Sequence, residues 1–320
     1  MWIAGIDEAG LGPVLGPLVV SAAAMSVPDE LAGQSLWDLL APAVCRKPSR
    51  RLAQVAIGDS KKLYSRKSKA GLTHLERAVL GMLAAERRTA TSLDDLLAVV
   101  APDAAASMAR YPWYAGSSLA LPQRISATDV AFAGNSLAAA LERRGITLAT
   151  IRCEAVLVEE FNRIVQAARN KSTAAFDVTC RLLAYLRRKF TGRLQVHVDR
   201  QGGRKRYLPA LERIFPDARM KILDEGDSSS GYSLIADGSR MDVFFTVGAE
   251  QQHLPVALAS MVSKYLRELF MTLFNRFWQE KVRDVAPTAG YYTDGRRFFE
   301  EIQPAMRQMA VETHLVYRCR

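Results

Sequence analysis

The chain reads Gly5-Ile6-Asp7-Glu8-Ala9-Gly10-Leu11-Gly12-Pro13 where its first apolar segment ends, so two adjacent carboxylates precede a glycine-rich turn. In a strand, neighbouring side chains point to opposite faces, and both carboxylates therefore serve one site only if the backbone turns at them. The glycines permit such a turn. Two neighbouring anions beside an apolar segment repel each other and lose hydration. Because a divalent cation would offset both costs, this stretch predicts a metal site at a strand end.

Composition predicts a folded protein with a polyanionic partner. The chain has 320 residues, of which 49% are hydrophobic and 24% are charged, enough for a full core in one or two domains. Its 43 Lys and Arg residues exceed its 33 Asp and Glu residues, giving a net charge of +10. This excess favours nucleic acid as a partner, and a merely solvated basic surface is the alternative.

Cysteine spacing and the apolar runs indicate the cellular compartment. The four cysteines are Cys45, Cys153, Cys180 and Cys319, and they form no C-x-x-C pair. Neither a zinc site nor a disulfide framework is therefore expected, and a reducing cytoplasm fits. The uncharged run from 9 to 28 contains glycines and prolines and follows two acids. We therefore expect buried strand there, and no signal peptide or membrane-spanning helix.

Hydrophobic periodicity predicts a mixed sheet flanked by helices. Strands are expected at 2–6, 14–24, 54–57, 146–158, 193–199 and 219–223, and a hairpin through Asp237-Gly238 joins 231–236 to 240–247. Helices are expected at 65–88 with Ser65 as N-cap, at 172–190 with Ser172 as N-cap, and from 255 to about 282.

The segment from about 89 to 150 is predicted to be an inserted subdomain within a single domain of residues 1–320. It contains a short helix near 92–100, the loop Tyr111-Pro112-Trp113-Tyr114 and an alanine-rich helix ending at Gly145. The aromatic loop either packs inside the insertion or stacks on exposed bases.

Two further carboxylates are candidates for the site. Asp199 ends a predicted strand and precedes the basic loop of residues 200–206, which could bring a phosphate close to it. The alternative is a capped strand end beside a solvated loop. Glu268 follows Lys264 by four residues on one helix face, an arrangement also typical of a surface ion pair.

These acids together match the needs of a two-metal phosphodiester hydrolase. Two Mg²⁺ ions roughly 4 Å apart would activate water and stabilise the departing oxygen, and Mg²⁺ prefers hard oxygen ligands. No histidine is required. His197 precedes Asp199 by two residues and so shares its strand face. It is either a group supporting the site or a structural histidine.

The acidic motifs and the segments around them resemble those of type 2 ribonuclease H, the ribonucleases HII and HIII. The resemblance rests on five blocks in order along the chain: Gly5 to Pro17, Asp59-Ser60-Lys61-Lys62-Leu63, Val196-His197-Val198-Asp199, the segment Ala259 to Glu268, and Gly290-Tyr291-Tyr292-Thr293. The first and fourth are specific and the last is weak. The insertion near 89–150 and the hairpin near 231–247 match none of the family's motifs.

The resemblance implies a ribonuclease H-like α/β fold with a central mixed sheet flanked by helices. It also implies that the catalytic, metal-binding carboxylates are Asp7, Glu8, Asp199 and Glu268, with Asp7 bridging two Mg²⁺ or Mn²⁺ ions. The implied reaction is hydrolysis of the RNA strand of RNA/DNA hybrids, or cutting at ribonucleotides embedded in DNA, giving 3′-hydroxyl and 5′-phosphate ends.

Leu11 departs from the family pattern, which has a basic residue between the two glycines. Gly10 and Gly12 would still approach the ribose, while the charge that positions a phosphate is lost. Arg204, Lys205 or Arg206 could replace it. The other residues that the resemblance implies at the substrate are Lys61, Lys62, Lys264 and Tyr291, and Tyr291 as core filler is the alternative.

The leading hypothesis is therefore a metal-dependent endonuclease acting on RNA in hybrid duplexes. A second hypothesis is a nucleic-acid-binding homologue without catalysis, suggested by Leu11 and the unmatched insertions. A third is a related nuclease for another structured nucleic acid. Retention of four acids favours catalysis, because a protein that only binds phosphate gains nothing from anions facing it.

Overall fold

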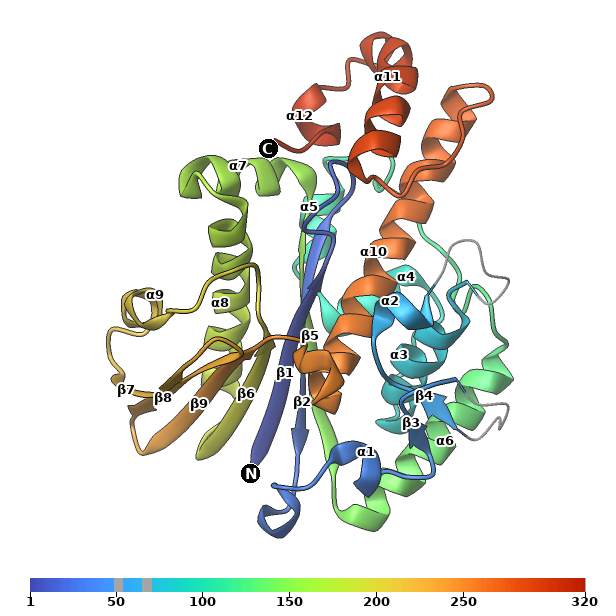
Figure 1. The fold of residues 1–320 in the computed structure, drawn as a ribbon. Coiled ribbons are helices and arrows are strands. Elements are labelled where there is room, and N and C mark those ends of the chain that lie inside the picture. The colour runs from blue at the N-terminus through green and yellow to red at the C-terminus, as the bar shows by residue number, and fades with distance from the viewer. Residues whose placement is uncertain (49–53, 65–70, 320) are drawn as a thin grey trace.

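A seven-stranded mixed sheet stands between two layers of helices (Figure 1). The structure, a computed structural model, describes residues 1–48, 54–64 and 71–319. The strand order is β5-β2-β1-β6-β9-β8-β7. The bounds are β1 Trp2–Ala9, β2 Leu18–Ser26, β5 Thr147–Val156, β6 Arg193–Asp199, β7 Arg219–Glu225, β8 Ser229–Ala236 and β9 Ser239–Thr246. The predicted α/β class with a central mixed sheet is confirmed.

Strand direction brings three strand ends to one edge of the sheet. β1, β2 and β5 are antiparallel neighbours, whereas β6 runs parallel to β1 and β9 runs parallel to β6. The predicted hairpin is formed by β8 and β9, and β7 adds an outer antiparallel strand. The carboxyl ends of β1, β6 and β9 therefore meet, which is where open sheets gather ligands.

Helices cover the two faces of the sheet unequally. On one face, α10 crosses β1 and β2 and packs on α3, which in turn packs on α6. The helices on this side are α3 Thr73–Ala85, α6 Ala127–Arg144 and α10 Leu254–Lys281. The other face carries α7 Val158–Ala168, α8 Lys171–Lys189 and α9 Leu208–Ile214.

Shorter elements complete the chain. They are η1 Asp29–Leu31, α1 Leu36–Leu39, α2 Ser60–Leu63, α4 Leu93–Val100, α5 Ala104–Met108, η2 Ala249–Gln251, α11 Tyr292–Gln308, α12 Thr313–Val316, and the two-stranded sheet of β3 Val44–Cys45 and β4 Val55–Ala56. Among the described helices, none combines the length and the apolar character needed to cross a membrane.

Several predicted boundaries are wrong for local reasons. The second strand begins at Leu18 because Val14 and Leu15 donate their backbone N–H groups to the carbonyl of Gly290 instead of to a strand. Residues 55–56 pair with β3 outside the main sheet. Helix α8 is capped by Asn170, whose side chain accepts hydrogen bonds from two backbone N–H groups, and the predicted cap Ser65 lies outside the described residues.

The inserted segment packs into the body of the protein. Tyr111, Trp113 and Tyr114 are each at most 3% exposed, which favours packing over base stacking for this aromatic loop. The buried Glu76 carboxylate accepts hydrogen bonds from the Tyr265 hydroxyl of α10 and from the backbone N–H groups of residues 123–125. A single carboxylate thus joins α3, α10 and the entry to α6.

Gly5 lets β1 lie directly against the backbone of α10. A Cβ added at Gly5 would lie 2.1 Å from the backbone nitrogen of Val256 and 2.3 Å from the carbonyl carbon of Pro255. Both neighbours are backbone atoms at the start of a buried helix, so neither can move alone. The close approach determines how far α10 stands from the carboxylates of β1.

We expect Gly5→Ala to lower the free energy of unfolding by about 2–3 kcal/mol, because α10 must move away from β1. Gly12→Ala is the matched control, since nothing lies within 4 Å of a Cβ added there. Urea denaturation of both variants measures the difference. Equal stabilities would show that the packing of β1 on α10 is not tight at Gly5.

Candidate active site

The first strand continues through both adjacent acids, which corrects the predicted turn. Asp7 pairs with Ser21 and Glu8 pairs with Val20 in the β1–β2 ladder. The two side chains therefore point to opposite faces of the sheet. The Asp7 carboxylate accepts a hydrogen bond from Ser260 of α10, whereas Glu8 Oε2 accepts one of 2.8 Å from Gln201 Nε2, on the α8 side.

Asp199 lies beside Asp7 on the same side of the sheet. Ile6 is level with Val198 in the parallel β1–β6 pairing, so Asp7 and Asp199 are the next residues of the two strands. The Asp199 carboxylate accepts a hydrogen bond of 2.8 Å from the backbone N–H of Ala249. The predicted strand-tip acid is thus in contact with η2, the turn that follows β9.

Glu250 of η2 is a fourth acid at this edge, and the sequence reasoning missed it. Its carboxyl is hydrogen-bonded to Asp199, and its charge acts on both Asp199 and Asp7. Glu250 Oε2 is buried and has no hydrogen-bond partner among the described residues. Glu250 lies in η2, four residues beyond the end of β9, so the signal that located Asp199, an acid at the end of a buried strand, does not identify it.

Burial and mutual repulsion raise the pKa values of Asp7, Glu8 and Asp199. Loss of hydration raises the pKa of Asp199 to about 8, with repulsion from Asp7 and Glu250 adding to it. Burial likewise raises the pKa of Glu8 to about 7, although Gln201 and Lys61 oppose the shift. The pKa of Asp7 lies well above its usual value, first from burial and then from Glu8. Such clustered shifts are typical of functional sites.

These residues suit a hard divalent cation. Asp7, Glu8, Asp199 and Glu250 offer only carboxylate oxygens, the ligands that Mg²⁺ and Mn²⁺ prefer, and one of those oxygens is buried without a donor. Within residues 1–48, 54–64 and 71–319, no three acidic, histidine or cysteine side chains already stand at ligand distances. Ion binding would therefore draw the carboxylates together.

Glu268 lies elsewhere on α10. Its Oε1 accepts a hydrogen bond of 2.9 Å from Lys264 Nζ, and its Oε2 accepts one of 2.6 Å from the Tyr64 hydroxyl. Lys264 Nζ also lies 4.7 Å from the centre of the Tyr64 ring. Because Glu268 is five residues beyond Ser263, whose hydroxyl donates to the Asp7 carbonyl, it stands about 7.5 Å further along the helix than that contact.

The predicted substrate-binding cations fall into two groups. Lys61 lies close enough to Glu8 to lower its pKa, and Lys62 pairs with Asp59 at 3.4 Å. In the basic loop, Arg204 donates to the Thr173 hydroxyl and lies over the ring of Phe176. The other two loop cations, Lys205 and Arg206, pair with Asp227 and Glu225.

Two buried arginines support the glycine-rich loop. Arg267 donates to the carbonyls of Leu15, Pro17 and Ala289, and Arg318 Nη1 donates to the carbonyl of Gly10 at 2.5 Å. Gly10 has φ +92°, and a Cβ there would meet the carbonyl of Pro17.

Leu11 and Tyr291 flank this loop differently. Leu11 is half-buried against the core on the α8 side of the sheet, so the side chain at this position contributes apolar contact. Tyr291 is 55% exposed and follows Gly290, whose carbonyl binds the loop, which disfavours its alternative role as core filler. Tyr291 and the glycines are therefore neighbours in the fold.

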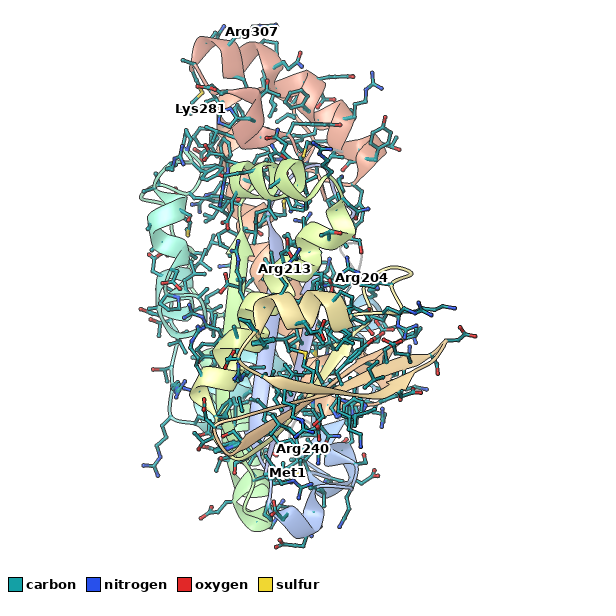
Figure 2. The ribbon with its side chains drawn as sticks, turned by 90° about the vertical axis from the view of Figure 1, so that its left-hand side faces the viewer. Met1, Arg204, Arg213, Arg240, Lys281 and Arg307 are labelled. Carbon is teal, nitrogen blue, oxygen red and sulfur yellow. The ribbon has the colours of Figure 1, made fainter. Side chains whose placement is uncertain are left out.

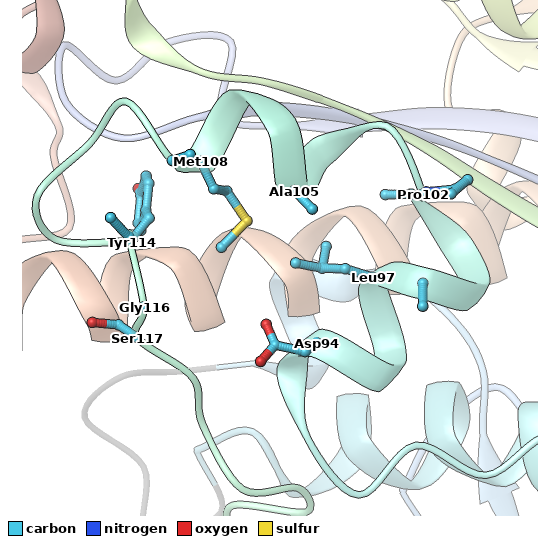
Figure 3. Close-up of a pocket in the computed structure, with 12 residues that line it drawn as sticks. Asp94, Leu97, Pro102, Ala105, Met108, Tyr114, Gly116 and Ser117 are labelled. Carbon is cyan, nitrogen blue, oxygen red and sulfur yellow. The ribbon is translucent and has the colours of Figure 1, made fainter.

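An apolar cavity of about 450 Å³ lies in the inserted segment, between α4, α5 and the loop at Tyr114 (Figure 3). Leu97, Ala105 and Met108 line it, and Asp94 and Ser117 stand at its polar side. None of the four clustered carboxylates lines this cavity. It is therefore a separate feature of the insertion.

No family model matches the chain, and no curated protein matches it. Among solved structures, it is similar to the RNase HII of the PCNA:RNase HII complex from Archaeoglobus fulgidus, with 18% identity, a TM-score of 0.42, and coverage of 100% of this chain and 95% of that one. Ribonuclease H2 from Pyrococcus horikoshii OT3 is 12% identical with a TM-score of 0.38, and the match covers 99% of this chain and 92% of that one. Bst-RNase HIII in complex with Mn²⁺ is 14% identical with a TM-score of 0.42, and the match covers 99% of this chain and 66% of that one. These proteins are of the kind that the sequence motifs resemble.

Substitution of Glu250 and of Glu268 separates the two candidates for the fourth metal ligand. We expect Glu250→Gln to weaken Mn²⁺ binding at least about tenfold, because it removes a carboxylate next to Asp199. Glu268→Gln, the matched control on α10, should leave the affinity near that of the wild type. Calorimetric titration with Mn²⁺ measures both, and the opposite ranking would assign the fourth ligand to Glu268.

The raised pKa values predict how pH changes the stability of the metal-free protein. An acid whose pKa is about 8 when folded and 3.8 when unfolded stabilises the fold at low pH, and that contribution is lost as pH rises between these values. In EDTA, we therefore expect the Tm of the wild type to fall from about pH 4 to pH 8 more steeply than that of Asp199→Asn. Parallel Tm profiles would contradict the assigned burial of this carboxylate.

Proposed function

We propose that this protein is a metal-dependent endonuclease of the type 2 ribonuclease H kind, hydrolysing phosphodiester bonds at ribonucleotides in hybrid or mixed duplexes. The observation that carries the proposal is the meeting of Asp7, Asp199 and Glu250 at one sheet edge, with Glu8 on the opposite side of the same strand end. The motif resemblance supports the choice of substrate.

In this proposal, Asp7, Asp199 and Glu250 would hold two divalent ions from one side of the strand end. Glu8 points to the other side, but its charge interacts with those of Asp7 and Asp199, and it would join them around the end of β1. When bound, Mg²⁺ or Mn²⁺ would supply an activated water and stabilise the departing oxygen. Ser260 and Gln201 orient the carboxylates of Asp7 and Glu8 through hydrogen bonds. Because the pKa values of Asp7, Glu8 and Asp199 are raised without a cation, metal affinity should rise with pH as protons are released.

The glycine-rich loop and Tyr291 would receive the ribose and the neighbouring phosphate. Arg267 and Arg318 hold the loop carbonyls from beneath, which leaves backbone at Gly10 and Gly12 to approach the sugar. With Leu11 in place of a basic residue, Lys61 beside Glu8 is the cation best placed to meet the phosphate. The other candidate cations contact protein side chains: Lys62 pairs with Asp59, Lys264 pairs with Glu268, and Arg204 donates to the Thr173 hydroxyl.

Cleavage of two labelled duplexes, an RNA/DNA hybrid and DNA with one embedded ribonucleotide, tests the proposal. With Mg²⁺ or Mn²⁺ we expect cutting only at ribonucleotide positions and none in EDTA. Asp7→Asn should lower turnover at least about 100-fold while leaving hybrid binding near the wild-type value. Tight binding without cutting under every metal condition would favour a binding-only homologue, and cutting of all-DNA junctions would favour a nuclease of different specificity.

A further inference from the structure

One sheet face beside the carboxylates is left open by the helices. Level residues of paired strands point to the same side, so the register of β6, β9, β8 and β7 places them in rows. We call these rows the open face: Arg193, Arg240, Ile235 and Arg219; Gln195, Asp242, Ser233 and Lys221; His197, Phe244, Gly231 and Asp224; and finally Asp199, Thr246 and Ser229.

Burial confirms which side of these strands is open. The intervening residues of β6, β8 and β9 are at most 3% exposed and form the core under α8 and α9: Leu194, Val196, Val198, Tyr232, Leu234, Met241, Val243 and Phe245. On the open face, Arg193, Arg219, Lys221 and Arg240 are exposed and Ile235 is 44% exposed, whereas Ser233 and His197 are buried. In Figure 2 the outer strands extend from the body, with Arg240 on one side and Arg213 of α9 on the other.

The two rows of the open face furthest from the carboxylate cluster are basic. They carry the four cations Arg193, Arg219, Lys221 and Arg240 and one carboxylate, Asp242, which pairs with Arg240 at 2.9 Å. The other carboxylates of the face, Asp224 and Asp199, lie in the two rows nearer the cluster. Arg193 and Asp199 are six residues apart on one strand, so the cationic row lies about 20 Å from the acid row. A chain of phosphates running along β6 would therefore reach the carboxylates with its other end held by these cations.

Three stacked rings lie between the cations and the acids. The rings of His253 and His197 have centroids 3.5 Å apart at 13°, and those of His197 and Phe244 are 5.5 Å apart at 19°. Phe244 ends the stack on the sheet and is half-buried. A base could extend this stack, since base–aromatic stacking on a basic sheet surface is a common mode of single-strand binding.

We propose that the open face binds a single-stranded segment of nucleic acid whose path continues to the carboxylate cluster. Charge complementarity selects a polyanion, and the ring stack selects one with accessible bases, which a continuous duplex does not offer. This binding goes beyond the hydrolysis proposed above. It requires no metal, so it can be measured separately from cleavage.

The test is fluorescence anisotropy of a labelled single-stranded 12-mer in EDTA. We expect the double variant Arg219→Glu, Lys221→Glu to bind at least tenfold more weakly. Losing two phosphate contacts should also reduce the slope of log affinity against log salt by about 1.4. The control pair, Lys281→Glu with Arg307→Glu, makes the same charge change at the other end of the molecule (Figure 2) and should weaken binding much less.

Phe244→Leu is a second variant that keeps apolar volume and removes the ring. We expect it to weaken single-strand binding at least about fivefold with an unchanged salt slope, because stacking and not charge is lost. Circular dichroism melting establishes that each variant is folded.

Three results would overturn the proposal. The first is binding of the 12-mer by the Arg219→Glu, Lys221→Glu variant as tight as by the wild type. The second is equal weakening of binding by the control variant. The third is a change in the sedimentation of the Arg219→Glu, Lys221→Glu variant without a change in its oligonucleotide binding. The last result would make the open face a surface for self-association.

Discussion

The parallel pairing of β6 with β1 and with β9 is the constraint on which the rest of the site depends. Parallel strands end at the same edge, so residues far apart in the sequence meet there: Asp7, Asp199 and Glu250. The side of these strands that faces α8 is packed in the core, which fixes the positions of the strand ends. Repulsion among the acids is therefore part of the folded state until a cation is bound.

Helix α10 fixes the remaining geometry. It approaches β1 so closely at Gly5 that Ser260 reaches the Asp7 carboxylate and the Ser263 hydroxyl reaches the Asp7 carbonyl. The same helix carries Arg267, whose guanidinium binds the glycine-rich loop. One helix thus positions the acids and the backbone that would face a ribose. Displacing α10 would disturb both.

Sequence reasoning located the strands that carry Asp7, Glu8 and Asp199 because each ends a clear apolar run. It failed where tertiary contact replaced local pattern. The turn expected at Asp7-Glu8 is absent because β2 pairs with β1 through both residues, and Val14 and Leu15 bind Gly290 instead of continuing β2. Glu250 was missed because its role depends on β9 lying beside β6, and the sequence places β9 only in a hairpin.

The structure around the carboxylate cluster is held by hydrogen bonds that do not involve the clustered acids. Helix α3, α10 and the inserted segment are joined through buried Glu76, and Arg267 and Arg318 bind carbonyls of residues 10–17 from beneath. None of these hydrogen bonds uses an oxygen of the clustered acids. The acids can then be drawn together or released by ion binding while the loop and α10 keep their places, so that repulsion among carboxylates favours metal binding instead of unfolding.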